Sequence, residues 1–171
     1  VGGRSCVISQ TGFSGESGYE IYLRNATLYA DDMWDAVLEA GKKHNLMVIA
    51  PAHHRRIQAG ILSWGQDLDH EHNPFQCNLG YQVSLSGKGE WEKKGDYIGK
   101  QALEKMKADL KDGHKPYKLQ LVGFEIGGKP IDEYAPDFWL VSPGDGGDPC
   151  GFITSPWYHP EKGKNIAMGY I

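Results

Sequence analysis

The sequence has few cysteines, no excess of positive charge and no long apolar run. It carries 18 Lys and Arg against 22 Asp and Glu, for a net charge of −4, so a nucleic acid is a poor candidate partner. No stretch approaches the roughly 20 apolar residues of a membrane-spanning helix, and we expect no membrane partner. The three cysteines, Cys6, Cys77 and Cys150, are widely spaced and odd in number. They indicate buried thiols in a reducing compartment, the cytoplasm, more than a disulfide framework or a metal site.

Several signatures of function are also missing. No signal peptide, nucleophile elbow, phosphate-binding loop or dinucleotide fingerprint is present. The first residues, VGGRSCVISQ, lead directly into a predicted strand and contain no Met, which suggests an internal piece of a longer protein. Apolar residues make up 40% and charged residues 23% of the 171 positions, a composition that supports a packed core. We therefore expect one ordinary domain or pieces of two.

The hydrophobic pattern predicts an α+β fold in two parts, residues 1–115 and 116–171. In the first part, apolar periodicity and turn residues predict helices that cover an at least partly antiparallel sheet. The expected strands are 4–10, 19–24, 46–50 and 81–86, and the expected helices are 28–44, 52–64 and 97–113. The second part has short strands separated by Gly and Pro turns, at 118–128, 138–142, 150–155 and 166–171. That pattern is typical of a small antiparallel β-barrel.

A glycine-rich acidic turn precedes the second predicted strand, in QTGFSGESGYEIYL at residues 10–23. Strand alternation places Tyr19, Ile21 and Leu23 on a core face and Glu20 and Tyr22 on the other. A carboxylate held on a strand can accept two parallel N–H bonds from a planar amidine-like edge, such as a guanidine or a 2-amino-pyrimidinone. The alternative is an ordinary exposed strand face.

Residues 65–78, GQDLDHEHNPFQCN, are polar and aperiodic and predict a loop of functional length. Asp67, Asp69, His70 and His72 alternate in a way that could chelate a divalent cation. No second ligand cluster with recognisable spacing follows, so we expect a polar loop and no metal.

The helix predicted at 52–64 and the tryptophans offer weaker candidates. Arg56 follows His53, His54 and Arg55, and we expect a half-exposed helix on which Arg56 pairs with a carboxylate. The tryptophans that could stack on a ring are Trp64, Trp91, Trp139 and Trp157, although most tryptophans belong to a core.

Four stretches, taken in order, resemble the glycine-cleavage T-protein (aminomethyltransferase) family. TGFSGESGYEI is similar to its T-G-x-T-G-E-x-G-x-E-I element, and YIGKQAL to its F-I-G-x-x-A-L. The segment that begins PAHHRRIQAGILSWGQDLD resembles A-R-D-x-L-R-L-E-A-G followed by G-x-D-x-D. The ending GFITSPWYHPEKGKNIAMGYI resembles G-x-V-T-S-G-x-x-S-P-x-x-x-x-N-I-A-M-G-Y-V.

The resemblance implies a tetrahydrofolate-binding enzyme that transfers a one-carbon unit. It implies half of a folate-binding α/β core followed by a barrel, without the N-terminal part that carries the family's substrate-side Asp. The catalytic residues are therefore expected outside this chain, and we expect the chain alone to be inactive. The family's pterin-gripping Glu carries over to Glu20, and Glu16 is the second candidate. Tyr22 and Trp64 are expected to pack beside the pterin, and Arg56 is a further candidate contact.

This chain departs from the aminomethyltransferase pattern at several positions. Ala52 and His53 stand where the family has Arg and Asp, Trp64 replaces a Tyr, and SPWYHP replaces S-G-x-x-S-P. These changes resemble the family's demethylase branch, which moves a methyl group from a methoxy or sulfonium donor to tetrahydrofolate. Our prediction is therefore a demethylase. One alternative is an aminomethyltransferase of the glycine cleavage system, which would require a lipoyl carrier protein. The other is a non-catalytic folate-binding regulatory module.

Overall fold

The computed structural model describes residues 2–85, 95–135, 137–144 and 146–171, and it has the predicted α+β fold. The chain forms two compact units, Val1–Ile61 and Leu62–Ile171, called here the N-terminal unit and the C-terminal unit. The boundary expected between residues 115 and 116 stays a prediction, and the candidate Trp91 lies outside the described residues. Within the described ranges, no helix is long and apolar enough to cross a membrane.

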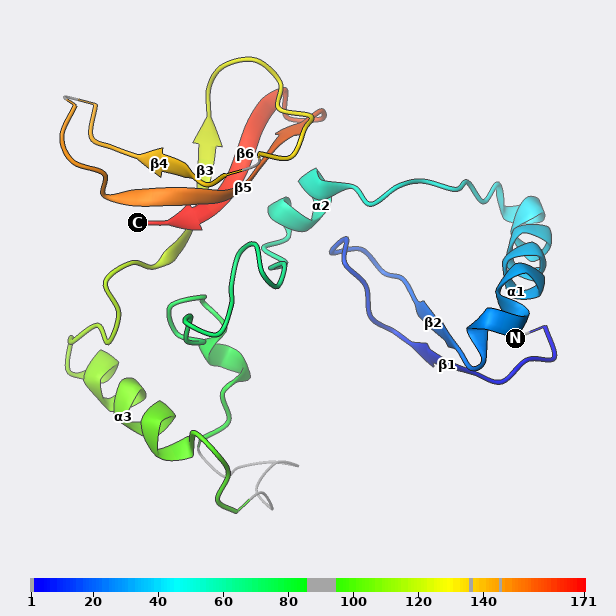
Figure 1. The fold of residues 1–171 in the computed structure, drawn as a ribbon, viewed down its shortest axis with the longest axis horizontal. Helices are drawn as coiled ribbons and strands as arrows, with labels where there is room; N and C mark the ends of the chain where they lie inside the picture. The colour runs from blue at the N-terminus through cyan, green and yellow to red at the C-terminus, as the bar shows by residue number, and fades with distance from the viewer. Residues whose placement is uncertain (1, 86–94, 136, 145) are drawn as a thin grey trace. The chain divides into compact units, whose positions relative to one another are not determined.

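The N-terminal unit begins with a β-hairpin, drawn in blue in Figure 1. Strands β1 (Cys6–Ser9) and β2 (Glu20–Leu23) are antiparallel, with Ser9 opposite Glu20 and Cys6 opposite Leu23. Both strands lie where the apolar alternation predicted them. The register places the glycine-rich turn at the end of the hairpin where Glu20 begins β2.

Helix α1 (Ala26–Gly41) follows the hairpin and continues into the short helix η1 (Lys42–His44). Its buried residue is Met33, whereas Trp34, expected on the covered face, is 52% exposed. Arg4 joins the start of the hairpin to this helix, because its Nη2 lies 2.5 Å from Asp32 Oδ2 and its guanidinium lies 4.1 Å from the centre of the Tyr29 ring. The helix was predicted correctly and its covered face was not.

Helix α2 (His53–Gln58) is shorter than the predicted helix 52–64. Gly60 has a left-handed φ of +70°, which glycine adopts without steric cost. The N–H of Gly60 bonds to Ile57 O at 3.1 Å, and the N–H of Ile61 bonds to Arg56 O at 2.9 Å. These two bonds form a Schellman cap, and they end the helix before the apolar residues that follow.

Two predicted strands are absent from the described residues. Residues 46–50 form no strand and their side chains are exposed. Residues 81–85 form the end of the short helix η2 (Gly80–Gln82) and an irregular stretch. Both predictions were wrong because apolar composition indicates that a segment can pair, while a strand also requires a neighbouring strand.

The C-terminal unit contains helix α3 (Lys100–Lys111) and a four-stranded antiparallel sheet in the order β3-β6-β5-β4. The strands are β3 (Leu121–Ile126), β4 (Trp139–Val141), β5 (Gly151–His159) and β6 (Lys164–Tyr170). Figure 1 draws them in yellow to red. All four were predicted from the sequence. Among the described residues they form an open sheet, so the predicted closure into a barrel is not observed.

Strand β6 is the centre of the sheet and of the core. Residues 165–170 are all buried, and Tyr170 is 0% exposed. Gly169 permits close packing of β6 on β5, because a Cβ there would lie 2.3 Å from the carbonyl oxygen of Phe152. Strand β5 has a bulge, since Ile153 is opposite Gly169 and Ser155 is opposite Met168, which leaves Thr154 as the extra residue.

Candidate functional site

The hairpin positions Glu20 as the first residue of β2. Its Oε2 accepts a hydrogen bond from the hydroxyl of Thr11 and another from the hydroxyl of Tyr22, at 3.1 Å for the latter. The hydroxyls of Ser9 and Thr11 lie 3.0 Å apart and continue this network. Glu20 and Tyr22 therefore lie on one face of β2, as strand alternation predicted.

The second oxygen of Glu20 faces no described donor. Both hydrogen bonds to this side chain end on Oε2, so Oε1 keeps its accepting capacity within the part of the chain that the structure describes. The side chain is half-buried and belongs to a strand. The arrangement is that of an anchored carboxylate with one oxygen available to a ligand that donates N–H bonds.

The core-face prediction for β2 was wrong. Tyr19 is 70% exposed, Ile21 is 41% exposed and only Leu23 is half-buried. Tyr22, on the other face, is also exposed. The hairpin is a two-stranded sheet, and within the N-terminal unit it has little covering its apolar side chains.

Glu16 lies in the turn and points to α2. Its Oε1 is 3.9 Å from Arg55 Nη1, with both side chains substantially exposed, and its backbone N–H bonds to Ser14 Oγ at 3.2 Å. The turn approaches the end of α2 closely, because a Cβ at Gly15 would lie 2.4 Å from the Cβ of Ala59. Glu16 thus belongs to the packing of the turn against α2.

Arg56 is buried beneath the turn, at 1% exposure. Its guanidinium lies 5.7 Å from the centre of the Phe13 ring, and its Nη1 donates to Ile61 O at 3.2 Å. Its Nε lies 3.5 Å from Nδ1 of His53, and burial together with the Arg56 charge lowers the pKa of His53. The half-exposed helix expected here is wrong at Arg56, which supports the turn from below.

In the C-terminal unit, loop 62–79 is attached to the sheet by Asp67. This carboxylate is 1% exposed. Its Oδ1 accepts from the hydroxyls of Thr154 and Ser155, and its Oδ2 accepts from the N–H of Ser63 at 2.8 Å. Consecutive strand residues normally point to opposite faces, and the bulge at Thr154 lets two neighbours reach the same oxygen.

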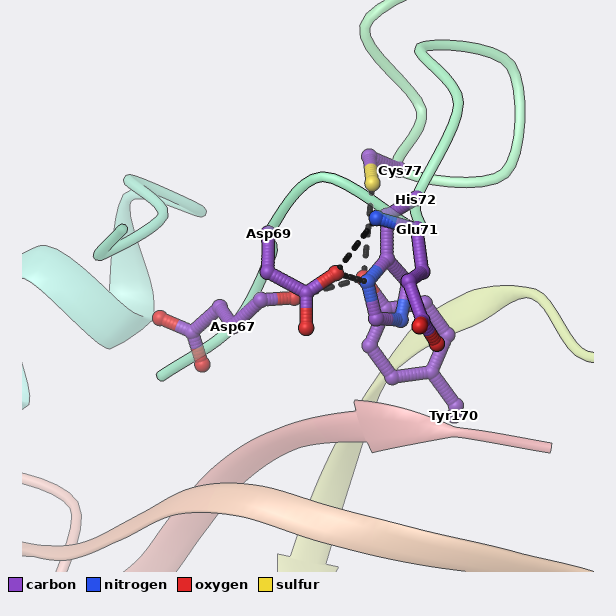
Figure 2. Close-up of polar contacts among 6 residues, drawn as sticks. All are labelled: Asp67, Asp69, Glu71, His72, Cys77 and Tyr170. Carbon is purple, nitrogen blue, oxygen red and sulfur yellow. Dashed lines mark hydrogen bonds and ion pairs between the residues drawn. The ribbon is translucent and has the colours of Figure 1, made fainter. Parts of the chain in front are cut away.

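Tyr170 extends the same network on the other side of the loop (Figure 2). Its hydroxyl donates to the carbonyl oxygen of Asp67 at 2.6 Å and lies 3.3 Å from Cys77 Sγ. Burial raises the pKa of Tyr170, and burial also raises the pKa of Cys77. Both groups are therefore neutral near pH 7. Of the three cysteines expected to be buried, Cys77 is buried, while Cys6 is half-buried and Cys150 is exposed.

Asp69 and His72 form a pair at the edge of this network. Asp69 Oδ1 accepts the backbone N–H of Glu71 at 2.8 Å and lies 2.7 Å from Nδ1 of His72, and these two contacts hold the pKa of Asp69 below its usual value. The His72 ring packs at 4.7 Å from the ring of Tyr170 (Figure 2). Within the described ranges, no group of three His, Cys, Asp or Glu side chains is placed to hold a metal ion.

Trp64 also belongs to the C-terminal unit. It is 61% exposed, and its ring meets that of His70 edge-on at 4.9 Å. Glu16, Glu20, Tyr22 and Arg56 all belong to the N-terminal unit, so the expected place of Trp64 beside a shared ligand stays a prediction.

Sequence reasoning missed the role of Asp67, which it considered only as a metal ligand. The signal was present as two separated parts, the G-x-D of the loop and the Thr-Ser pair in GFITSP. Nothing in the linear order indicates that residues almost ninety positions apart share one hydrogen-bond network. Only the bulge in β5 brings Thr154 and Ser155 to the same carboxylate.

Comparison with known proteins agrees with this architecture. A solved structure of the glycine cleavage system aminomethyltransferase T from Bartonella henselae superposes with a TM-score of 0.69 at 24% identity, and the match covers 96% of this chain and 41% of that one. The aminomethyltransferase of Caldanaerobacter subterraneus subsp. tengcongensis is 31% identical over all of this chain and 41% of its own length. That of Symbiobacterium thermophilum is 32% identical over 96% of this chain and 40% of its own.

The fold thus defines an α+β protein of the aminomethyltransferase T architecture. The profile of the GCVT N-terminal domain matches residues 1–87, about half of the chain, and the chain belongs to that family. The matched stretch includes both the acidic turn and Asp67. The chain spans about two fifths of the length of these curated relatives.

Proposed function

We propose that this chain contributes the pterin-binding carboxylate of a tetrahydrofolate-dependent aminomethyltransferase. Membership of the GCVT family and the names of the relatives favour this alternative over the demethylase expected from the sequence. The observation that carries the proposal is Glu20, whose Oε2 is fixed by Thr11 and Tyr22 while Oε1 is available among the described residues.

The geometry of Glu20 suits the edge of a pterin. The 2-amino-4-oxo ring presents neighbouring N–H donors, which an ionised carboxylate accepts in charge-assisted hydrogen bonds. Thr11 and Tyr22 hold the side chain in one orientation, so little conformational freedom is lost when the ligand binds. Tetrahydrofolate would supply the N5 and N10 atoms that receive the one-carbon unit, and the residues of this chain would orient the ring.

The other candidates have subordinate roles in this proposal. Tyr22 is exposed and offers a ring face beside Glu20, and Trp64 is a second stacking candidate. Glu16 and Arg56 act on the turn, because Glu16 approaches Arg55 and Arg56 lies under Phe13. The donor site and the residues that act on the donor are expected in the part of the family that this chain does not span. Aminomethyl transfer would involve a lipoyl carrier protein as partner.

The test is tetrahydrofolate titration in a full-length family scaffold. Residues 1–171 replace the matched part of the Caldanaerobacter aminomethyltransferase, and affinity is measured by calorimetry. Glu20→Gln should weaken tetrahydrofolate binding by about 1.5–3 kcal/mol, or roughly 10- to 150-fold, because a hydrogen bond to a charged group is lost. Glu39→Gln, at an exposed glutamate of α1, is the matched control and should bind as the parent does. Unchanged affinity in Glu20→Gln removes Glu20 from the site.

The same chimaera separates the candidate reactions. An aminomethyltransferase should form methylene-tetrahydrofolate only when an aminomethylated lipoyl carrier protein is supplied. Formation of methyl-tetrahydrofolate from a methoxyaromatic or sulfonium compound without that carrier would instead support the demethylase. Folate binding with neither product would support the regulatory module. For residues 1–171 alone we expect weak or no folate binding and no turnover.

A further inference from the structure

Residues 46–50 of the N-terminal unit, Leu-Met-Val-Ile-Ala, expose an unusual run of apolar side chains. Leu46 is 50% exposed, Met47 79%, Val48 61% and Ile49 74%. Single exposed apolar residues are common on protein surfaces, whereas contiguous apolar patches mark interaction sites. The composition also has the β-branched character of a buried strand, which is why the sequence predicted one here.

The backbone of this segment is available for pairing. The N–H of Leu46 bonds to Gly41 O at 3.1 Å. From Met47 to Ala50, no hydrogen bond joins the backbone to any other described residue. Figure 1 shows the segment as an open stretch between η1 and α2. An extended chain with unpaired N–H and C=O groups is a template for the addition of a strand.

An apolar hollow adjoins the segment at Leu46. It has a volume of about 480 Å³ and is lined by Ala36, Val37, Ala40, Gly41, Lys43, His44 and Leu46. The small side chains of α1 form most of its wall, and Lys43 and His44 contribute the polar part. An extended segment beside a hollow of this kind can accept main-chain hydrogen bonds and an apolar side chain from the same partner.

We propose that residues 46–50 form a strand of a sheet completed by the part of the GCVT polypeptide that this chain does not span, with one of its apolar side chains in the hollow. The relatives are about two and a half times as long as the match, so the missing cover has a defined source. A strand that is buried on both faces also explains the uninterrupted apolar sequence. The proposal depends on family membership and not on folate chemistry.

The first experiment adds the unmatched part of the Caldanaerobacter aminomethyltransferase to residues 1–171 and follows backbone hydrogen exchange. We expect a one-to-one complex in which exchange at residues 47–50 slows at least tenfold. Ile49→Lys should weaken the complex at least tenfold, because it places a charge in the apolar interface. Leu28→Lys is the matched control, since Leu28 is 72% exposed on α1 and lies outside the hollow and segment; it should bind normally.

A second format does not require the added fragment to fold alone. In the chimaera described above, residues 47–50 should exchange at least ten times more slowly than in the isolated chain, whether or not folate is present. Fast exchange at these residues in both formats, with β6 still protected, overturns the proposal. It is also overturned if the isolated chain forms a dimer that already protects residues 47–50, because a second copy is then the occupant. Folate affinity is measured separately, so a failure of the proposed function is distinguishable from a failure here.

Discussion

The two units differ in how they treat polar and apolar side chains. The C-terminal unit buries a carboxylate, Asp67, and satisfies it with donors from the sheet and the loop. The N-terminal unit leaves Ile21 and Ile49 exposed and presents a carboxylate, Glu20, with one oxygen available. A closed network of hydrogen bonds stabilises a fold, whereas an open carboxylate beside uncovered apolar surface is suited to binding.

The physical origin of the difference is the supply of neighbours. Strand β6 has a strand on each side, so its residues 165–170 are buried and the loop can pack against them. Strands β1 and β2 have only each other. An isolated two-stranded hairpin is marginal in water, and here Arg4 and the contact of the turn with α2 give it additional support.

Removal of Asp67 should have the largest effect on this comparison. Asp67→Ala leaves buried donors from Thr154, Ser155 and Ser63 without their acceptor, and we expect it to destabilise the C-terminal unit by about 3–5 kcal/mol. Native-state hydrogen exchange of β6 amides measures that unit separately. Asp69→Asn, at an exposed carboxylate in the same loop, is the control and should leave β6 exchange unchanged. Similar effects from both variants would show that Asp67 has no special structural role.

Arg56 should be the corresponding support of the N-terminal unit. Arg56→Lys removes the planar guanidinium that lies over Phe13 and bonds to Ile61 O, at an expected cost of about 1–3 kcal/mol in local stability. The measurement is amide exchange in β2, which should become faster. Arg55→Lys is the adjacent control, because its contact with Glu16 is long and exposed and such pairs contribute little. If Arg55→Lys accelerates β2 exchange as much, burial of Arg56 is not the cause.

Tyr170 should give the smallest effect at neutral pH, together with a distinct dependence on alkali. Tyr170→Phe loses the bond to Asp67 O and should cost about 1–2 kcal/mol at pH 7. Burial raises the folded-state pKa of Tyr170 above the unfolded value near 10, so its stabilising contribution is complete below pH 10 and is lost as the pH rises further. The stability difference between parent and variant should therefore shrink by about 1.4 kcal/mol per pH unit above 10.

Urea unfolding from pH 8 to 11 checks this prediction. Tyr81→Phe, at a tyrosine that is 81% exposed, is the control and should unfold in parallel with the parent across the range. A constant difference between parent and Tyr170→Phe would show that the Tyr170 hydroxyl ionises as readily in the folded state as in the unfolded chain.

Much of the secondary structure could be predicted from the sequence because it depends on local patterns. Strands β1 and β2 followed from alternation, α1 and α3 from helical periodicity, and β3 to β6 from short apolar runs between turns. The end of α2 was missed because its Schellman cap at Gly60 was not recognised before the apolar residues that follow. The shared face of Glu20 and Tyr22 was also predictable, since residues two apart on a strand point the same way.

The tertiary structure alone decided which predicted faces and strands are covered. Leu46–Ile49 has the composition of a buried strand, and it remains unpaired because no described strand is available beside it. Asp67 looked like a surface acid until the bulge at Thr154 directed two hydroxyls to it. The sequence determined where Glu20 lies in its hairpin and which family the chain resembles, because both depend on local order. The anchoring of one Glu20 oxygen, the burial of Arg56 and the Asp67 network depend on contacts between distant residues, which local patterns do not encode.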